Sequence, residues 1–262
     1  MFKAKKNQET KNNNLKIIVL IICCSLAFGF VGSLIAQQFL EKMEDGTSNT
    51  QETSSIVVSS DNLSIPDVVS LVQDSTVSIE TNFVSKGENM VAAGSGVIVR
   101  ADGYIATNAH VVVGAQSIKV TLHNGTEYNA TLVGKNEKDD IAVLKINATG
   151  LKAVTFEESD NIKVGMSVIA IGNVLGELNN SVTDGIISAI NRTVTIDDNE
   201  MTLIQTDTEI NHGNSGGGIF RLNGKCIGIV VAKSTGDDVE GVGFVIPSAV
   251  VKNVSDELIA KA

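Results

Sequence analysis

Short runs of β-branched and other apolar residues, separated by turn dipeptides, fill most of the chain after residue 75. The runs cover residues 76–80, 96–100, 117–122, 142–146, 167–171, 203–205, 225–231 and 242–246. Turn signals of the Asp-Gly and Asn-Gly type fall between them, at positions 102–103, 124–125, 184–185 and 223–224. Many short strands at a spacing of about ten residues are typical of an antiparallel sandwich or of barrels. The pattern therefore predicts an all-β fold.

A helical pattern stands at each end of this region, so the folded domain is predicted to span residues 63–262. The first pattern opens at Ile65 and has Pro66 in its first turn, where proline is tolerated. The second covers residues 248–260 and predicts a closing helix. A domain of this length buries roughly 70% of its unfolded surface, which allows a substantial core.

The N-terminal part of the chain has a different character. An uncharged apolar stretch runs from Ile17 to Ala36, and as a helix it would be about 30 Å long, the thickness of a bilayer core. Five lysines precede it. These features predict a basic cytoplasmic tail over residues 1–16, a transmembrane signal-anchor over 17–36 and an extracytoplasmic remainder. The alternative is a signal peptide cleaved after Gly29, although the apolar run is longer than such peptides need.

Residues 37–62 are rich in Ser, Thr, Asn, Gln and Glu and predict a polar linker.

Charge and cysteine content exclude several classes of function. The formal net charge is −10, and aromatic residues make up 4% of the chain with no Trp, so we expect no nucleic-acid partner. The three cysteines offer neither a disulfide framework nor a CxxC zinc site. No cluster has metal-ligand spacing, so neither a metal nor another cofactor is expected. Cys226 lies in a strand-like run and is expected to be a small buried residue.

Three segments carry the residue types of nucleophilic catalysis. They are residues 101–112, 138–145 and 206–217, which supply a histidine, two aspartates and a serine in that order. A serine hydroxyl needs a base to remove its proton, and the base needs a carboxylate to fix its tautomer. The resulting oxyanion needs N–H donors already in place, and glycines allow the backbone to aim them. The order His, Asp, Ser is that of the chymotrypsin class.

These segments, with five others, resemble the HtrA/Deg group of trypsin-like serine proteases. The matching stretches are GSGVIV at 94–99, DGYIATNAHVV at 102–112, DDIAVLKI at 139–146, IGNVLG at 171–176, SVTDGIISA at 181–189, TDTEINHGNSGG at 206–217, NGKCIGI at 223–229 and GVGFVIPS at 241–248. The resemblance implies two six-stranded antiparallel β-barrels with the site in the cleft between them. We place the boundary between the barrels near residues 150–160.

The resemblance also assigns a catalytic role to particular residues. His110 would be the general base, Ser215 the nucleophile and Asp140 the orienting acid. Asp139 is the alternative acid, one position earlier. Residues 172–183 resemble the mobile loop that helps to order this site in the family.

The oxyanion hole and the specificity pocket follow in the same way. The hole would use the N–H groups of Gly213 and Ser215, and Asn214 would contribute to the shape of the loop. The pocket would include Ile210 and Glu209. Ile210 favours small aliphatic side chains at the cleaved position, whereas Glu209 would favour basic ones. We expect the aliphatic preference.

Two features depart from the family pattern. His212 stands where the family usually has proline, which would fix φ and stiffen the turn. We therefore expect a more mobile oxyanion hole and a lower resting activity. Family members commonly continue into PDZ domains, but only 14 residues follow Ser248, so capture of substrates by a PDZ domain is not expected. The resemblance leaves a homotrimer open.

The sequence thus predicts a single-pass bacterial membrane protein with an outward-facing serine endopeptidase domain. Its partners would be unfolded or damaged proteins as substrates and the membrane through the N-terminal helix. The alternative is a protease-like peptide-binding or chaperone module with weak or latent hydrolysis. Substitution of Ser215 separates the two.

Overall fold

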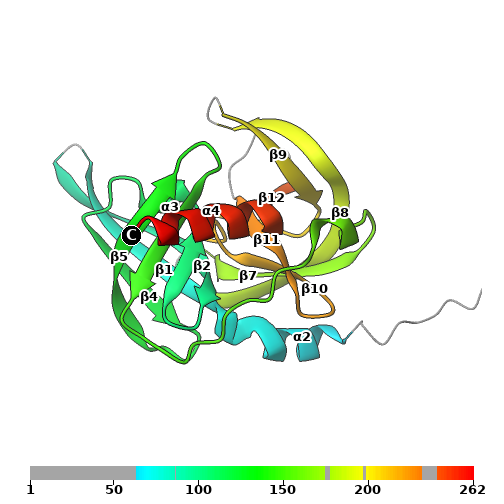
Figure 1. Cartoon of the computed structure of the whole chain (residues 1–262), viewed down its shortest axis with the longest axis horizontal. Helices are drawn as coiled ribbons and strands as arrows, with labels where there is room; N and C mark the ends of the chain where they lie inside the picture. The colour runs from blue at the N-terminus through cyan, green and yellow to red at the C-terminus, as the bar shows by residue number, and fades with distance from the viewer. Residues whose placement is uncertain (1–62, 86, 175–177, 197–198, 232–240) are drawn as a thin grey trace, which may run out of the picture. The chain divides into compact units, whose positions relative to one another are not determined.

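The computed structural model describes residues 63–262, except 86, 175–177, 197–198 and 232–240 (Figure 1). The predicted tail, transmembrane segment and linker therefore lie outside the described residues. Among the described residues, no helix has both the length and the hydropathy that a membrane span requires.

The first half of the domain contains α2 (Ile65–Val72), η1 (Gln73–Ser75), β1 (Thr76–Ser85), β2 (Glu88–Arg100), β3 (Tyr104–Thr107), α3 (Ala109–Val112), β4 (Ser117–Leu122), β5 (Glu127–Asn136) and β6 (Ile141–Ile146). The second half contains η2 (Ser159–Asn161), β7 (Ser167–Val174), β8 (Leu178–Ile196), β9 (Asn199–Thr206), β10 (Gly218–Arg221), β11 (Cys226–Val231), β12 (Gly243–Pro247) and α4 (Ser248–Ala260).

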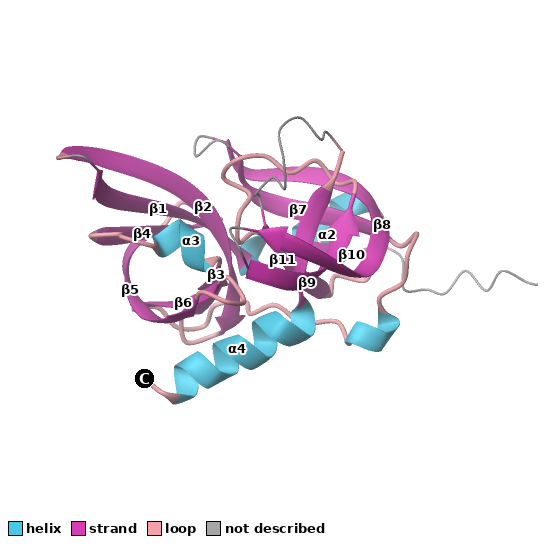
Figure 2. Ribbon diagram, turned by 90° about the horizontal axis from the view of Figure 1, so that it is seen from above, coloured by secondary structure: helices cyan, strands magenta, loops and turns pink. Residues whose placement is uncertain are grey.

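The described strands close into two antiparallel barrels of six strands each. The first has the order β1-β2-β3-β6-β5-β4, and the second has the order β10-β11-β12-β9-β8-β7. Figure 2 shows the barrels side by side, with α4 running past both. The prediction of an all-β fold with a closed six-stranded barrel and a C-terminal helix is confirmed. The boundary proposed near residues 150–160 falls in the connection from β6 to β7.

Aliphatic residues fill the interior of the first barrel. Ile79 of β1 lies opposite Val120 of β4, and Ile105 of β3 lies opposite Leu144 of β6. All four side chains are fully buried and belong to one apolar cluster. β-Branched residues prefer extended backbone, which favours the strands. Burial of each aliphatic side chain stabilises the fold by about 1.5–3 kcal/mol. The same residues therefore favour strand formation and form the core.

A second apolar cluster joins the two barrels. It contains Val97 and Ala106 of the first barrel, Leu203 and Phe244 of the second, and Val251 of α4. All five residues are buried. The barrels therefore share a core, which fixes the position of one barrel relative to the other.

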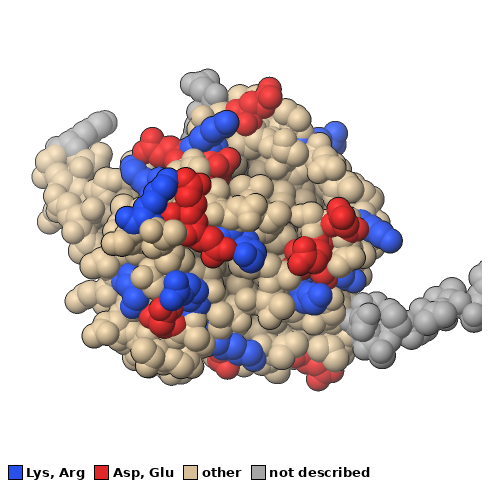
Figure 3. All heavy atoms as spheres, in the orientation of Figure 1, with Lys and Arg blue, Asp and Glu red and all other residues tan. Residues whose placement is uncertain are grey.

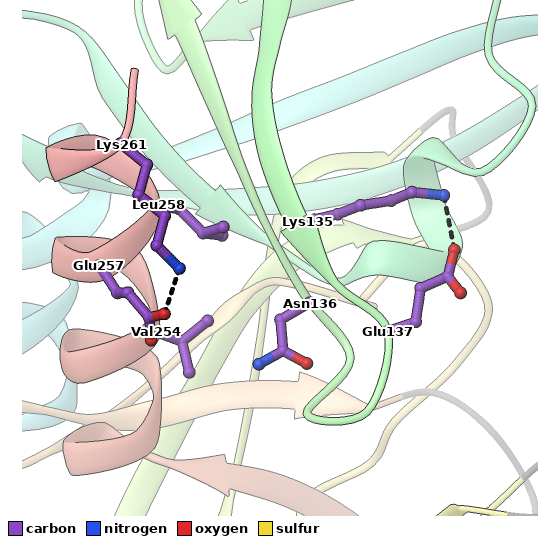
Figure 4. A pocket seen from close by; sticks show the side chains of 7 residues that line it. All are labelled: Lys135, Asn136, Glu137, Val254, Glu257, Leu258 and Lys261. Atoms are coloured by element: carbon purple, nitrogen blue, oxygen red, sulfur yellow. Dashed lines mark hydrogen bonds and ion pairs between the residues drawn. The ribbon is translucent and has the colours of Figure 1, made fainter.

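Helix α4 packs on β5 and β6 of the first barrel and on β11 and β12 of the second. Leu258 lies over Gly134, where an added Cβ would stand 3.0 Å from the Leu258 Cδ2 atom. A groove of about 400 Å³ separates the end of α4 from the turn after β5, and Figure 4 shows Leu258 on its α4 wall. On the opposite wall Lys135 pairs with Glu137 at 2.6 Å. The helix thus holds the barrels together mainly through apolar contacts.

Charged side chains of both signs are interspersed on the face shown in Figure 3. Exposed pairs such as Lys252–Asp256, at 2.8 Å, lie on the outside of the domain. Water screens such pairs, so each contributes little to stability.

The Glu157 carboxylate contrasts with these exposed groups. The Glu157 side chain is fully buried in the connection between the barrels. Its partners are Arg221 at 2.5 Å, Asn161 and Asn223 at 3.1 Å, and Lys225 at 3.3 Å. Burial alone would raise the pKa of Glu157, but the hydrogen bonds, that from Asn223 foremost, outweigh it and lower the pKa from 4.5 to about 2. Glu157 therefore ties the connection to the β10–β11 turn as an ionised group.

We expect Glu157→Gln to lower the free energy of unfolding by about 3 kcal/mol at neutral pH, because Arg221 loses its buried partner charge. The pKa of Glu157 is depressed in the folded state, so its stabilising contribution is complete above pH 4.5 and is lost as the pH falls towards about 2. Denaturant unfolding of the parent and the variant should therefore show a difference that shrinks below pH 4.5.

The control is Glu137→Gln, which removes a carboxylate from an exposed pair and should change stability little at any pH. A Glu157→Gln effect that stayed constant from neutral pH to pH 3 would contradict this account.

Candidate active site

Strand register brings His110 and Asp140 together. β3 and β6 are antiparallel neighbours, with Thr107 opposite Ala142. The chain that leaves β3 and the chain that enters β6 therefore meet at the same end of the barrel. His110 lies on α3, just after β3, and Asp140 is the residue immediately before β6.

The His110 ring lies between Asp140 and Ser215. Its Nδ1 is 2.8 Å from Asp140 Oδ2, and its Nε2 is 3.0 Å from Ser215 Oγ. The backbone N–H of His110 donates to the second carboxylate oxygen, Asp140 Oδ1, at 3.0 Å. With the ring proton on Nδ1 facing the carboxylate, Nε2 can accept the proton of the Ser215 hydroxyl.

The backbone of Asp140 is held in an unusual conformation, with φ at +50°. Its carbonyl accepts hydrogen bonds from the Ala109 N–H at 3.2 Å and from Asn108 Nδ2 at 3.1 Å. Left-handed backbone costs a non-glycine residue of the order of 1–3 kcal/mol, so these contacts keep Asp140 aimed at His110. The adjacent Asp139 instead lies 2.6 Å from Asn136 Nδ2.

Ser215 lies in the loop between β9 and β10 and is buried. The Asn214 N–H donates to the Asn211 carbonyl at 3.0 Å, and Gly213 has φ at +94°, the combination found in a type II turn. Gly216 has φ at +81°, and an added Cβ there would stand 2.3 Å from a backbone oxygen of β2. Glycine is therefore favoured at both positions, and at Gly216 a side chain would also collide with β2.

The loop also supplies the predicted oxyanion donors. Within the described part of the chain, the N–H groups of Gly213 and Ser215 have no hydrogen-bond partner. The buried Asn214 closes the loop through both backbone groups, since its carbonyl accepts the Gly217 N–H at 2.8 Å. The two N–H groups that the sequence assigns to the oxyanion hole are thus not used within the described structure.

The two predicted pocket residues have different surroundings. Ile210 packs on Gly243 of β12, where an added Cβ would stand 2.4 Å from Ile210 Cδ1. It joins the apolar cluster inside the second barrel. Glu209 is exposed and accepts a hydrogen bond from Asn211 Nδ2 at 3.2 Å. Ile210 thus presents apolar surface, whereas Glu209 faces solvent. His212 is exposed at the turn.

A cavity of about 260 Å³ adjoins the histidine and the aspartate. Its lining includes Val113 from the first barrel and Ile196 and Met201 from the second. The cavity therefore opens between the barrels and offers apolar walls beside His110.

Several residues that hold the site together receive no role from the sequence pattern. Ser95 and Thr107 are fully buried and hydrogen-bond to each other, and Asn108 supports Asp140. The signal available for Ser95 is its place as a polar residue between two glycines at 94 and 96, in a strand that is otherwise apolar there.

Other reactive groups lie apart from the site. Cys226 is buried, and burial raises the pKa of its thiol to about 12. A thiol with so high a pKa is unreactive at neutral pH. Within residues 63–262, as far as the structure describes them, no group of three or more His, Cys, Asp or Glu residues could hold a metal ion.

Comparison with known proteins places this geometry in a family. The model of the trypsin-like peptidase domain matches residues 94–229, just over half of the chain. The serine protease Do-like HtrA of Bacillus subtilis is 46% identical over 178 residues, which make up 64% of this chain and 40% of that protein. The periplasmic serine endoprotease DegP of Escherichia coli K12 is 45% identical over 175 residues, 66% of this chain and 37% of that protein. The chain thus spans about two fifths of the length of these relatives.

A solved structure of the HtrA-type protease AlgW with a decapeptide has a TM-score of 0.70 and 35% sequence identity, and the match covers 76% of this chain and 67% of that chain. A second AlgW structure, with a tripeptide, has a TM-score of 0.68 and 38% identity over 75% of this chain and 64% of that chain. The chain therefore belongs to the family of trypsin-like peptidase domains, and its domain is of the HtrA/DegP type.

Proposed function

We propose that this chain is a serine endopeptidase that cleaves unfolded or damaged proteins outside the cytoplasm. The observation that carries the proposal is the continuous contact from Asp140 through His110 to Ser215, at 2.8 Å and 3.0 Å. This is the arrangement that an activated serine nucleophile requires. The family and the names of the relatives, which are serine proteases and endoproteases, support the same reaction.

The reaction has two halves. Ser215 Oγ attacks the carbonyl carbon of the peptide while His110 Nε2 takes its proton. His110 then gives this proton to the leaving amine, and the C–N bond breaks to leave an acyl-enzyme. Water attacks the ester in the same manner and releases Ser215. Asp140 stabilises the imidazolium ion in both halves. The chemistry needs no cofactor.

The negative charge that develops on the carbonyl oxygen needs preorganised donors. We assign this role to the N–H groups of Gly213 and Ser215, with Asn214 fixing the turn between them. Removing one such donor costs about 10²–10³ in kcat in serine proteases, so the shape of this loop governs the rate.

The site of action is proposed from the sequence and the relatives together. The basic tail, the anchor over residues 17–36 and the linker over 37–62 would hold the protease domain on the outer face of the membrane. DegP is named as a periplasmic enzyme, which supports an extracytoplasmic location. A homotrimer stays a prediction, and sedimentation of the purified chain tests it.

We expect Ser215→Ala to abolish cleavage of casein and labelling by a fluorophosphonate. Asp140→Asn should lower kcat by about 10⁴-fold, because the amide no longer fixes the productive tautomer of His110. Asp139→Asn is the matched control, since this neighbouring carboxylate contacts Asn136 instead, and it should retain most of the activity.

Equal losses for Asp139→Asn and Asp140→Asn would show that the wrong acid has been assigned. Binding of unfolded protein without cleavage by the parent chain would favour the alternative, a peptide-binding or chaperone module.

We expect the parent enzyme to cleave after small aliphatic residues, because we assign the wall of the pocket to Ile210, an apolar side chain that packs against Gly243. Ile210→Ala should raise the preference for Leu or Phe over Val about tenfold in kcat/KM. Glu209→Gln should leave the profile unchanged, because this carboxylate is exposed. A peptide-library profile dominated by Lys or Arg would refute the assignment.

We expect His212→Pro to raise the resting activity about two- to fivefold. Proline suits the second position of a type II turn. It also lowers the conformational entropy of the chain when the turn is not formed, which stabilises the turn by about 0.4–1 kcal/mol. Steady-state cleavage of a short peptide measures the effect, with His212→Ala as the control for loss of the imidazole. Unchanged activity in the proline variant would show that the turn is already fully populated.

A further inference from the structure

Ser95 of β2 lies fully buried against the loop that carries Ser215. Its hydroxyl donates to the Gly213 carbonyl at 2.8 Å and accepts the Asn173 N–H at 2.8 Å. A buried hydroxyl with partners on both sides is committed to the protein interior. Ser95 can therefore act on the reaction only through the groups that it holds.

The backbone of Ser95 holds the same loop. Its N–H donates to the Ser215 carbonyl at 2.8 Å, and its carbonyl accepts the Thr107 hydroxyl at 2.7 Å. Thr107 is the last residue of β3, three positions before His110. One residue thus contacts both the nucleophile loop and the strand that leads to the general base.

The two carbonyls that Ser95 holds stand on either side of the nucleophile. The Gly213 carbonyl belongs to the peptide group between residues 213 and 214, and the Ser215 carbonyl belongs to the group between 215 and 216. The Ser215 N–H lies in the peptide group between these two. Because each peptide group is planar, fixing both neighbours leaves little freedom for the direction of the Ser215 N–H and side chain.

Close packing reinforces the hydrogen bonds. An added Cβ would stand 2.3 Å from the Ser95 carbonyl oxygen at Gly216, 3.0 Å from Ser95 Oγ at Gly172, and 3.3 Å from Ser95 Cβ at Gly217. Three glycines of the second barrel therefore face Ser95 directly, and the contact crosses from the first barrel into the site.

We propose that Ser95 is a positioning residue for peptide hydrolysis, which holds the Ser215 side chain and the Ser215 N–H in the geometry that the transition state requires. The inference rests on the proposed function, because it names a further residue for the same reaction. A positioning role predicts that substitution of Ser95 lowers kcat more than it affects folding or substrate binding.

The test is Ser95→Ala in the full chain. The substitution leaves the Gly213 carbonyl without its donor and the Asn173 N–H without its acceptor. For a fluorogenic peptide we expect kcat to fall about 10- to 100-fold, while KM changes less than about threefold. Affinity for a peptide boronic acid, which forms a tetrahedral adduct with the serine, should fall in the same proportion, whereas affinity for the cleaved product peptide should not.

Ser248→Ala is the matched control. Ser248 is equally buried and donates its hydroxyl to a backbone carbonyl, that of Glu157, at 2.7 Å, but it lies at the start of α4. It should lower the melting temperature about as much as Ser95→Ala does and leave kcat unchanged below that temperature. If Ser95→Ala does not fold, Ser95→Cys keeps a side chain of similar shape but only a weak donor and acceptor, and it should also lower kcat without a matching change in KM.

A Ser95→Ala enzyme with kcat within about twofold of the parent, or a fall in kcat that Ser248→Ala matches, would overturn the role of Ser95 and leave the proposed function standing. A parent chain no more active than Ser215→Ala would overturn both.

Discussion

Everything at the candidate site depends on the apolar contact between the two barrels. His110 and Asp140 belong to the first barrel, whereas Ser215 belongs to a loop of the second, so no local sequence preference can set the 3.0 Å between His110 Nε2 and Ser215 Oγ. The shared core around Val97 and Phe244 positions the barrels, and the hydrogen bonds from Ser95 then fix the Ser215 loop within that arrangement. Such interiors are packed as densely as organic crystals, so they hold one relative position and resist small shifts.

Three residues of the site have positive φ angles. Asp140 has φ at +50°, Gly213 at +94° and Gly216 at +81°. None of the three lies inside a strand, where the sheet would impose an extended backbone. Each is restrained by hydrogen bonds from elsewhere, namely those to the Asp140 carbonyl and those made by Ser95. The two glycines adopt such angles without strain, whereas Asp140 is strained, and strain of this kind is maintained where the surrounding structure over-determines it.

The sequence predicts much of the fold because burial and strand preference coincide in the core. The runs at 117–122 and 142–146 closely match β4 and β6, and the helical patterns match α2 and α4. β5 gives no such signal because its side chains are mostly exposed, and α3 has four residues, too few for a periodic pattern. The motifs single out His110, Asp140 and Ser215, and the structure brings these three together. Ser95 stands out in the sequence only as a polar residue between two glycines, and its role does not follow from that, because its hydroxyl contacts a residue 118 positions away.

The distribution of the reacting groups along the chain has a consequence for biosynthesis. The base and the acid are complete once β6 has emerged, but the nucleophile follows 75 residues after Asp140. Helix α4 follows β12, packs on both barrels and can dock only when both have formed. A chain that is still being synthesised therefore has no assembled site until the strands around Ser215 have emerged as well. The base and the acid are placed by the first barrel alone, and the nucleophile reaches them only when the second barrel packs against the first.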